Sequence, residues 1–453
     1  MPSALPEDVL LPIFKCATIF PSLDWPEAKY DAWRATTPFT LAAVCKSWRI
    51  LARSSASLWT YFGVPFRLRQ HANQKSVFHT RHISRLHAAH KTRLQLLLVL
   101  SQGSPVDVVF FRDSDEVSTT GNTTELIGLL ADLAPRWRHV RLVVNQSDLT
   151  SFAPALGGRC QRLRSLALNV NSERLIARPF SSAPELEALS LVYAGIERPE
   201  ETPLDTSLPG LKTLRICMDS MMGTYHFCRT LATQLTELCI IDRAPWEAPR
   251  VTFGSLHRLT VVDATYLRHI HAPALHTLAF HVESLLRAPG PVADLSSYSV
   301  VRHLKLFGYV GLDEVEILQI FAEITALEFS VPRGVDNQSY GIDNTFFAAL
   351  AGDTLRQTLW PKLERVIFDR HGWQVDSFDR YSVEDLIRRR AANSDGRAHT
   401  LPDLVDRTVA NELEASQTDV QRSSPVIPDE RSQDTKTPVG RWWTNRKTRR
   451  QRG

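Results

Sequence analysis

Residues 184–191 read Pro-Glu-Leu-Glu-Ala-Leu-Ser-Leu, and this spacing decides the fold that the sequence predicts. Leu189 and Leu191 flank a single polar residue, and Leu186 stands three positions before them. Apolar residues that alternate with a period of two are typical of a short β-strand with one buried face. Pro184 restricts the backbone just ahead of the strand, so it ends the preceding segment and fixes the entry into the strand.

The pattern Leu-x-x-Leu-x-Leu, or an apolar variant of it, recurs along most of the chain. Its units are Trp137–Leu142, Leu163–Leu168, Leu186–Leu191, Leu211–Ile216, Leu235–Ile240, Leu256–Val261, Leu275–Phe280, Val301–Leu306, Ile324–Phe329 and Leu363–Phe368. Successive units begin 19–26 residues apart, except that the last follows after 39. These lengths are typical of leucine-rich repeats, in which each repeat adds one strand to a growing sheet. Proline stands two residues before the unit also at positions 135, 209, 273 and 361.

The repeats predict an α/β fold: an irregular leucine-rich-repeat-like solenoid of parallel strands, with Val106–Phe111 as its first strand. The repeat's usual asparagine is present only at Asn145 and Asn171, which is why an irregular solenoid is expected. A doubly wound α/β sheet is the alternative, and it needs helices of about 10–15 residues between strands. The segment between Cys239 and Leu259 is too short and too rich in proline for such a helix, which favours the solenoid.

Two apolar stripes precede the repeats. Leu10, Ile13 and Phe14 follow the acidic pair Glu7-Asp8, which favours a helix N-terminus. The stretch from Pro38 to Trp59 is predicted to be a second helix and its exit, with Thr37 as the cap and one stripe of apolar residues at Leu41, Val44, Trp48 and Leu51. Two helices of this size are too small to form a domain alone. Part of their apolar surface must therefore cover the rest of the chain or a partner.

In this order the N-terminal residues resemble the F-box-like motif that is common in fungal proteins. The motif reads Leu5-Pro6-x-x-x-Leu10-x-x-Ile13-Phe14, then Leu41-x-x-Val44-Cys45-x-x-Trp48-x-x-Leu51, then Ser57-Leu58-Trp59. The resemblance implies a helical module that docks on the Skp-type adaptor of a cullin–RING ubiquitin ligase. The adaptor-binding residues that it implies are Leu5, Pro6, Leu10, Ile13, Phe14, Leu41, Val44, Cys45, Trp48, Leu51 and Trp59. Two departures from the family are Pro12, expected to break or kink the first helix, and a long connection over residues 18–37.

Composition excludes several classes of protein. The chain has 453 residues, 43% hydrophobic and 23% charged, as in soluble globular proteins. A net charge of +4 is too small for nucleic-acid binding to be the main function, and no apolar run reaches the roughly 18 residues of a membrane span. Six scattered cysteines indicate reduced, buried thiols in the cytoplasm or nucleus.

No catalytic motif is present, so we expect no enzyme activity and no cofactor. The five histidines between His71 and His90 spread too far along a helix to hold one metal ion, so no metal is expected either.

Residues between the leucines of each unit should face outward on the sheet and form the surface that recognises a substrate. Among them the basic side chains outnumber Glu237 and Glu328; they are Arg141, Arg215, Arg258, Lys305 and Arg365. A mildly basic face would attract acidic or phosphorylated protein substrates. The alternative is that these charges only keep an exposed sheet soluble.

The predicted organisation has five parts: an F-box-like helical domain over residues 1–65, a connecting helix over 66–105, the solenoid over 106–380, a capping helix over 381–392 and a disordered tail with a basic end over 393–453. Deleting the tail should change the free energy of unfolding by no more than about 1 kcal/mol.

The predicted function is that of a substrate-recruiting adaptor of a Skp–cullin–F-box ligase. Two other classes remain open: a protein-interaction scaffold without a ligase, and a nuclear protein that acts through its basic tail.

Overall fold

The computed structural model describes residues 5–18, 30–66, 77–112, 120–158, 160–172, 183–194, 208–217, 228–241, 249–282, 297–310, 317–329, 360–368 and 403–406, with a few single residues between them. The chain divides into two compact units, residues 1–406 and 407–453, and every described residue belongs to the first. The predicted capping helix over residues 381–392 and the basic end lie outside the described residues.

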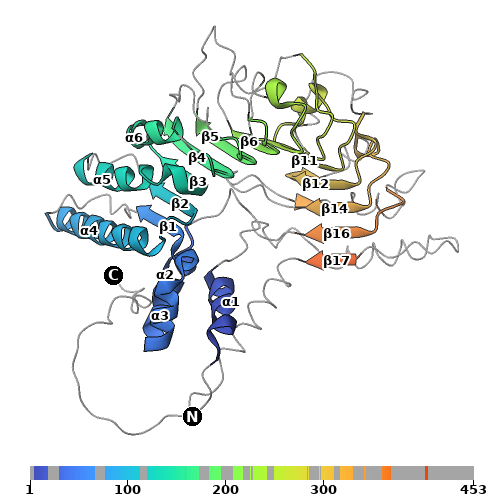
Figure 1. Cartoon of the computed structure of the whole chain (residues 1–453). Helices are drawn as coiled ribbons and strands as arrows, with labels where there is room; N and C mark the ends of the chain where they lie inside the picture. Colours follow the sequence, from blue (N-terminus) through green and yellow to red (C-terminus); the bar gives the residue numbers. More distant parts are fainter. Residues whose placement is uncertain are drawn as a thin grey trace, which may run out of the picture. The chain divides into compact units, whose positions relative to one another are not determined.

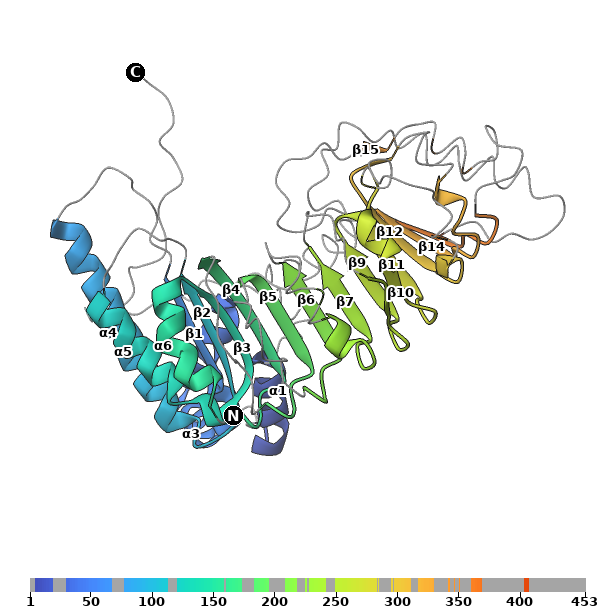
Figure 2. The same cartoon turned by 90° about the horizontal axis from the view of Figure 1, so that it is seen from above.

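The first unit is a mixed α/β structure with a large parallel sheet (Figures 1 and 2). The sheet has thirteen strands, which are β1 (Tyr61–Phe66), β2 (Val106–Arg112), β3 (Trp137–Val144), β4 (Ser165–Ser172), β5 (Ala188–Ala194), β6 (Thr213–Cys217), β7 (Glu237–Ile240), β9 (Arg258–Val261), β11 (Thr277–His281), β12 (His303–Phe307), β14 (Ala326–Phe329), β16 (Arg365–Phe368) and β17 (Asp403–Asp406). Their order in the sheet follows the chain and never reverses. A doubly wound sheet reverses its order at a switch point, so that alternative is wrong.

Two short parallel pairs accompany the large sheet: β8 (Val251–Thr252) with β10 (Ile270–His271), and β13 (Tyr309–Val310) with β15 (Gly341–Ile342). A 3₁₀ helix, η3 (Ala264–Arg268), leads from β9 to β10. All ten predicted repeat units coincide with a strand of the large sheet, as the alternation of their leucines predicts.

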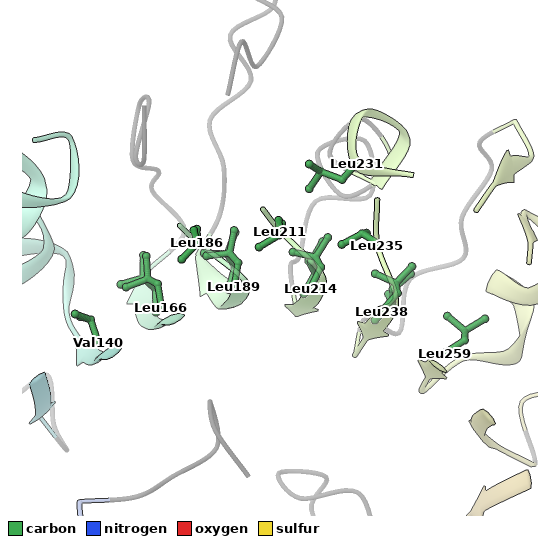
Figure 3. Close-up of a cluster of buried hydrophobic side chains, with 14 of the residues drawn as sticks. Val140, Leu166, Leu186, Leu189, Leu211, Leu214, Leu231, Leu235, Leu238 and Leu259 are labelled. Carbon is green, nitrogen blue, oxygen red and sulfur yellow. The ribbon is translucent and has the colours of Figure 1, made fainter. Parts of the chain in front are cut away.

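Leucines in equivalent positions hold the strands in register. Leu166 is the register partner of Leu189 on the next strand, and Leu189 is that of Leu214. The same row continues through Leu238 and Leu259 (Figure 3). Each side chain in it is at most 2% exposed, because all of them point to the same side of the sheet. A slip of one residue would bring every leucine of a strand to the other face, so the apolar rows specify the pairing strongly.

A tight turn before each strand explains the repeated prolines. The backbone N–H of Leu186 donates to the carbonyl of Ala183 at 3.2 Å, and that of Leu211 donates to Leu208 at 3.1 Å. In both turns proline is the second residue, where its fixed φ suits a β-turn and its missing N–H costs nothing. The prolines therefore place the first leucine of each unit at the core.

Three helices cover the first strands. They are α4 (Val77–Leu100), α5 (Thr120–Ala131) and α6 (Gln146–Leu156), and both views show them side by side near β1–β4 (Figures 1 and 2). Their buried residues join the strand leucines in one apolar core. Asn145 caps α6 by accepting from the backbone N–H of Asp148 at 3.0 Å, and a one-turn 3₁₀ helix, η2 (Ala134–Arg136), leads into β3.

Two predicted boundaries are wrong. The first strand of the sheet is β1, which pairs with β2 in parallel, so α4 connects two strands of the sheet instead of joining two domains. At the other end, β17 lies within the segment predicted to be a disordered tail and pairs with β16. The predicted start of the tail at residue 393 is therefore too early.

Removing β17 should be measurable. We expect a chain that ends at Ala392 to have a free energy of unfolding about 1–3 kcal/mol lower than one that ends at Asp406, because β16 loses its backbone hydrogen bonds to β17. Both chains lack residues 407–453, so urea unfolding of the pair isolates the strand. Equal midpoints for the two chains would show that the pairing of β16 with β17 contributes nothing to stability.

Candidate functional site

The N-terminal helices begin and end differently from the prediction. They are α1 (Glu7–Thr18), α2 (Ala32–Val44), α3 (Lys46–Ser54) and a 3₁₀ turn, η1 (Ala56–Trp59). The prediction of one helix and its exit over Pro38–Trp59 is wrong, because two helices share this stretch, Asp31 instead of Thr37 caps the first, and Pro38 lies inside it. The chain is extended at Cys45, with φ −155°, where α2 ends.

The expected break at Pro12 does not occur either. Helix α1 continues through Pro12, which is exposed. The connection predicted over residues 18–37 is also shorter than expected, since α2 starts at Ala32 and takes in its last third.

Aromatic side chains hold these helices together. The rings of Phe14 and Trp48 meet edge to face with centroids 4.8 Å apart, and those of Phe39 and Trp59 do so at 5.1 Å. The indole N–H of Trp59 donates to the carbonyl of Ala52 at 2.6 Å. Phe14 is fully buried and belongs to the same apolar core as the sheet, so these contacts anchor α1 and α3 to the rest of the unit.

The structure divides the predicted adaptor-binding residues into three groups. Leu10, Phe14, Leu51 and Trp59 are buried and form part of the core, whereas Leu41 and Trp48 are half-buried against it. The exposed members are Leu5, Pro6, Ile13, Val44 and Cys45. Only the exposed and half-buried residues can contact a partner without unfolding of the helices.

Two further exposed apolar residues lie on the same helices but do not belong to the motif. Val9 is 43% exposed and stands four residues before Ile13 on α1, and Ile50 is 59% exposed on α3. We call Leu5, Val9, Ile13, Val44 and Ile50 the outer apolar surface. The period of four in Leu5, Val9 and Ile13 could have identified the α1 part from sequence. Val9 and Ile13 form a short second apolar stripe on α1 besides the buried one, and Leu5 stands just before the helix begins.

Cys45 is exposed, contrary to the prediction that all cysteines are buried; Cys16 is exposed as well. The Cys45 sulfur caps α3 by accepting from the backbone N–H of Trp48 at 3.4 Å. Hydrogen bonds from the Ser47 hydroxyl and from that N–H lower the pKa of the Cys45 thiol. Its role in the fold is thus to start α3 where α2 has stopped.

The five basic residues predicted for the substrate surface do not form a cluster. Arg141, Arg215 and Lys305 share one register row, three or four strands apart, which separates neighbours by about 14–19 Å. Arg258 and Arg365 occupy the adjacent row, four strands apart.

Carboxylates accompany two of the five. Arg258 pairs with Glu237 at 3.3 Å, and Lys305 pairs with the buried Glu328 at 2.9 Å. His303 also lies 3.3 Å from Glu328. These pairs lower the net positive charge of the face and therefore the attraction for acidic substrates that the sequence predicts.

A buried charge cluster at the start of the same face was not predicted. Asp107 on β2 is 1% exposed and forms ion pairs with Arg34 of α2 and Arg138 of β3. Burial alone would raise the pKa of Asp107, but the hydrogen bond from Arg138 and the charge of Arg34 outweigh burial and hold it below its ordinary value. Arg34 also lies over the ring of Tyr61 at 4.7 Å. The cluster therefore ties α2 to the first three strands.

Metal and membrane sites were also sought in the described residues. No three His, Cys, Asp or Glu side chains there are placed to hold a metal ion. On α4, burial lowers the pKa of His87, and burial with the nearby charge of Arg93 lowers that of His90 to about 4, so both rings are neutral near pH 7. Among the described helices none is both long and apolar enough to cross a bilayer.

No protein-family model matches the chain, and its sequence matches no curated protein.

Proposed function

We propose that this protein is a substrate-recruiting adaptor of a Skp–cullin–F-box type ubiquitin ligase. In this proposal helices α1–α3 and η1 are an F-box-like module that binds the Skp-type adaptor. The large sheet is an irregular leucine-rich-repeat-like solenoid whose outward side chains bind the substrate protein. The cytoplasm, the nucleus or both would be the compartment of such a complex.

The observation that carries the proposal is the outer apolar surface. Its five side chains are 43–59% exposed, although the same helices bury Leu10, Phe14 and Leu51 well. Single exposed apolar residues are common on any protein, but several on one small helical unit are typical of a site that binds a partner. Three members, Leu5, Ile13 and Val44, belong to the motif that resembles an F-box, which favours a Skp-type adaptor as that partner.

The outward face of the sheet supports the second half of the proposal. Successive strands pair without a change of order, so their outward side chains form rows at fixed spacing. Extended surfaces of this kind suit a protein ligand better than a small molecule. Arg215 lies on β6, near the middle of this sheet, and is the residue of the face to change first.

Exposed residues give a cleaner test than the motif's tryptophan, because Trp48 also packs on Phe14. The double change Ile13→Asp with Val44→Asp should abolish binding to a purified Skp-type adaptor, since it places two charges in an apolar contact. Both side chains are about half exposed, so the melting temperature should stay unchanged. Binding is measured by calorimetry, and folding by circular dichroism.

Val300→Asp is the matched control, since Val300 is 45% exposed and lies between β11 and β12 instead of on the helices. It should bind the adaptor as the unchanged protein does. Full binding by the double variant, or no binding by the unchanged protein, would contradict the ligase proposal and favour an interaction scaffold without a ligase.

A further inference from the structure

An apolar groove lies between α2 and α4, and none of the residues of the outer apolar surface lines it. Its volume is about 590 Å³, and its lining includes Ala35 and Phe39 from α2 with Ala88, Ala89 and Leu96 from α4. The small side chains of the alanines leave this volume open, and the larger side chains of Phe39 and Leu96 border it. Neither Phe39 nor Leu96 belongs to the motif that resembles an F-box.

Arg93, the only charged residue in the lining, is already engaged. Its guanidinium donates to the carbonyl of Ala35 at 2.7 Å and lies 5.7 Å from the ring of Phe39. Besides Arg93, the polar side chains of the lining are two threonine hydroxyls, at Thr36 and Thr92. The groove therefore suits an apolar stripe better than a polar small molecule, which needs several converging hydrogen-bond partners.

Large apolar side chains continue the groove along both helices. Trp33 is 53% exposed and stands one turn before Thr36 on α2. Leu96 and Val99 are 44% and 72% exposed on α4, where they follow Thr92 at helical spacing. Exposed tryptophan and leucine beside small residues are typical of sites that receive the apolar face of a helix.

The charge of the segment that contains α2 and α4 indicates the sign of the charge that a partner would carry. Residues 32–106 contain eleven Lys and Arg and no Asp or Glu, so they carry a formal charge of +11 in a chain of net charge +4. The other residues together carry −7. In the described part of this region Lys46, Arg49, Arg53 and Arg85 are exposed on α3 and α4. Arg34 and Lys91 pair with Asp107 and Glu125, which lie outside this segment, and the remaining positive charge attracts acidic partners and repels basic ones.

We propose that the groove between α2 and α4 is a docking site for an acidic amphipathic helix of a partner protein. Its apolar stripe would lie on Ala35, Ala88 and Ala89, between Phe39 and Leu96. Its carboxylates would face the exposed basic residues of α3 and α4. The site goes beyond the proposed adaptor contact, because it uses none of the five residues of the outer apolar surface.

A polyanion such as RNA or an anionic membrane is the other partner that a basic surface could attract. Neither needs a groove lined by alanines, and RNA does not account for the exposed apolar residues that border it. The position of the groove within the basic segment is what favours a helix with both an apolar and an acidic face.

Two synthetic helical peptides of about four turns test this proposal. Both carry leucine at positions i, i+3, i+4 and i+7, and the remaining positions are Glu in one and Lys in the other. With the full-length protein, fluorescence anisotropy should show the Glu peptide binding at least about tenfold more tightly than the Lys peptide. Added salt should weaken its binding. Hydrogen exchange should slow in α2 and α4.

Ala89→Gln fills the groove without changing the charge, so it should weaken binding of the Glu peptide about tenfold or more. Ala43→Gln, the same change at an exposed alanine of α2 outside the lining, is the matched control and should bind normally. Equal binding of the two peptides, or unchanged binding by Ala89→Gln, would overturn the proposal. Binding of RNA or of phosphatidylserine vesicles together with unchanged peptide binding by Ala89→Gln would assign the basic surface to a polyanion.

Discussion

Replacing Asp107 by asparagine is expected to lower the free energy of unfolding by about 3 kcal/mol. The change removes the carboxylate that Arg34 and Arg138 share, and it leaves two positive charges close together in a largely buried site. The estimate lies at the lower end of the range for broken buried pairs, because the Arg138 side chain is 39% exposed and keeps some contact with water. Urea unfolding followed by circular dichroism measures the loss.

The lowered pKa of the Asp107 carboxylate predicts how the free energy of unfolding changes with pH. The pKa of Asp107 in the folded protein lies below its value in the unfolded chain, so its contribution is fully present above about pH 4. This contribution is lost as the pH falls through the folded pKa. The difference in stability between the unchanged protein and Asp107→Asn should therefore be constant from pH 7 to about pH 4 and shrink below it. Other titrating groups are shared by both proteins and cancel in this difference.

Asp132→Asn is the matched control, since Asp132 is exposed just after α5. It should change the free energy of unfolding by less than about 0.5 kcal/mol. If Asp107→Asn were as stable as this control, the buried pairs would not hold α2 against the sheet.

The repeat strands could be predicted from sequence because their signal is local. A leucine pair at a spacing of two, with a proline-containing turn ahead of it, specifies a strand and its buried face without knowledge of its neighbours. The row from Leu166 to Leu259 then follows, since only one register buries every leucine.

Strand β1 could not be predicted in this way. It contains Gly63 and Pro65, which both weaken a strand taken by itself. Tertiary structure explains both residues. β1 is the edge of the sheet, where the missing N–H of Pro65 is tolerated. A Cβ at residue 63 would lie 2.6 Å from the ring of Tyr30, so glycine fits there and a larger residue does not.

The candidate site was predicted only in part, for a related reason. The apolar spacing of Leu41, Val44, Trp48 and Leu51 fits one helix, yet the chain breaks at Cys45 and divides the stripe between two helices. The break depends on how α3 packs, above all on the contact of Trp48 with Phe14 from α1. Such a contact joins residues 34 positions apart and leaves no periodic signal in the sequence.

The contact between Phe14 and Trp48 also leads to the second large expected effect. Phe14→Ala should destabilise the attachment of α1 by about 3–5 kcal/mol, because the ring is fully buried and its removal leaves a cavity beside Trp48. Helix α1 lies at the end of the unit, so the loss should be local and should leave the sheet folded. Hydrogen exchange should become faster in α1 and stay slow in β3–β7.

Ile13→Ala is the matched control on the same helix, since Ile13 is 49% exposed and contributes little to the core. It should leave hydrogen exchange in α1 unchanged. If the adaptor proposal is right, both changes weaken adaptor binding, but only Phe14→Ala does so by releasing α1. Slow exchange in α1 of Phe14→Ala would contradict the anchoring role of the ring. Strong adaptor binding by Phe14→Ala despite fast exchange in α1 would instead place the binding surface on α2 and α3 alone.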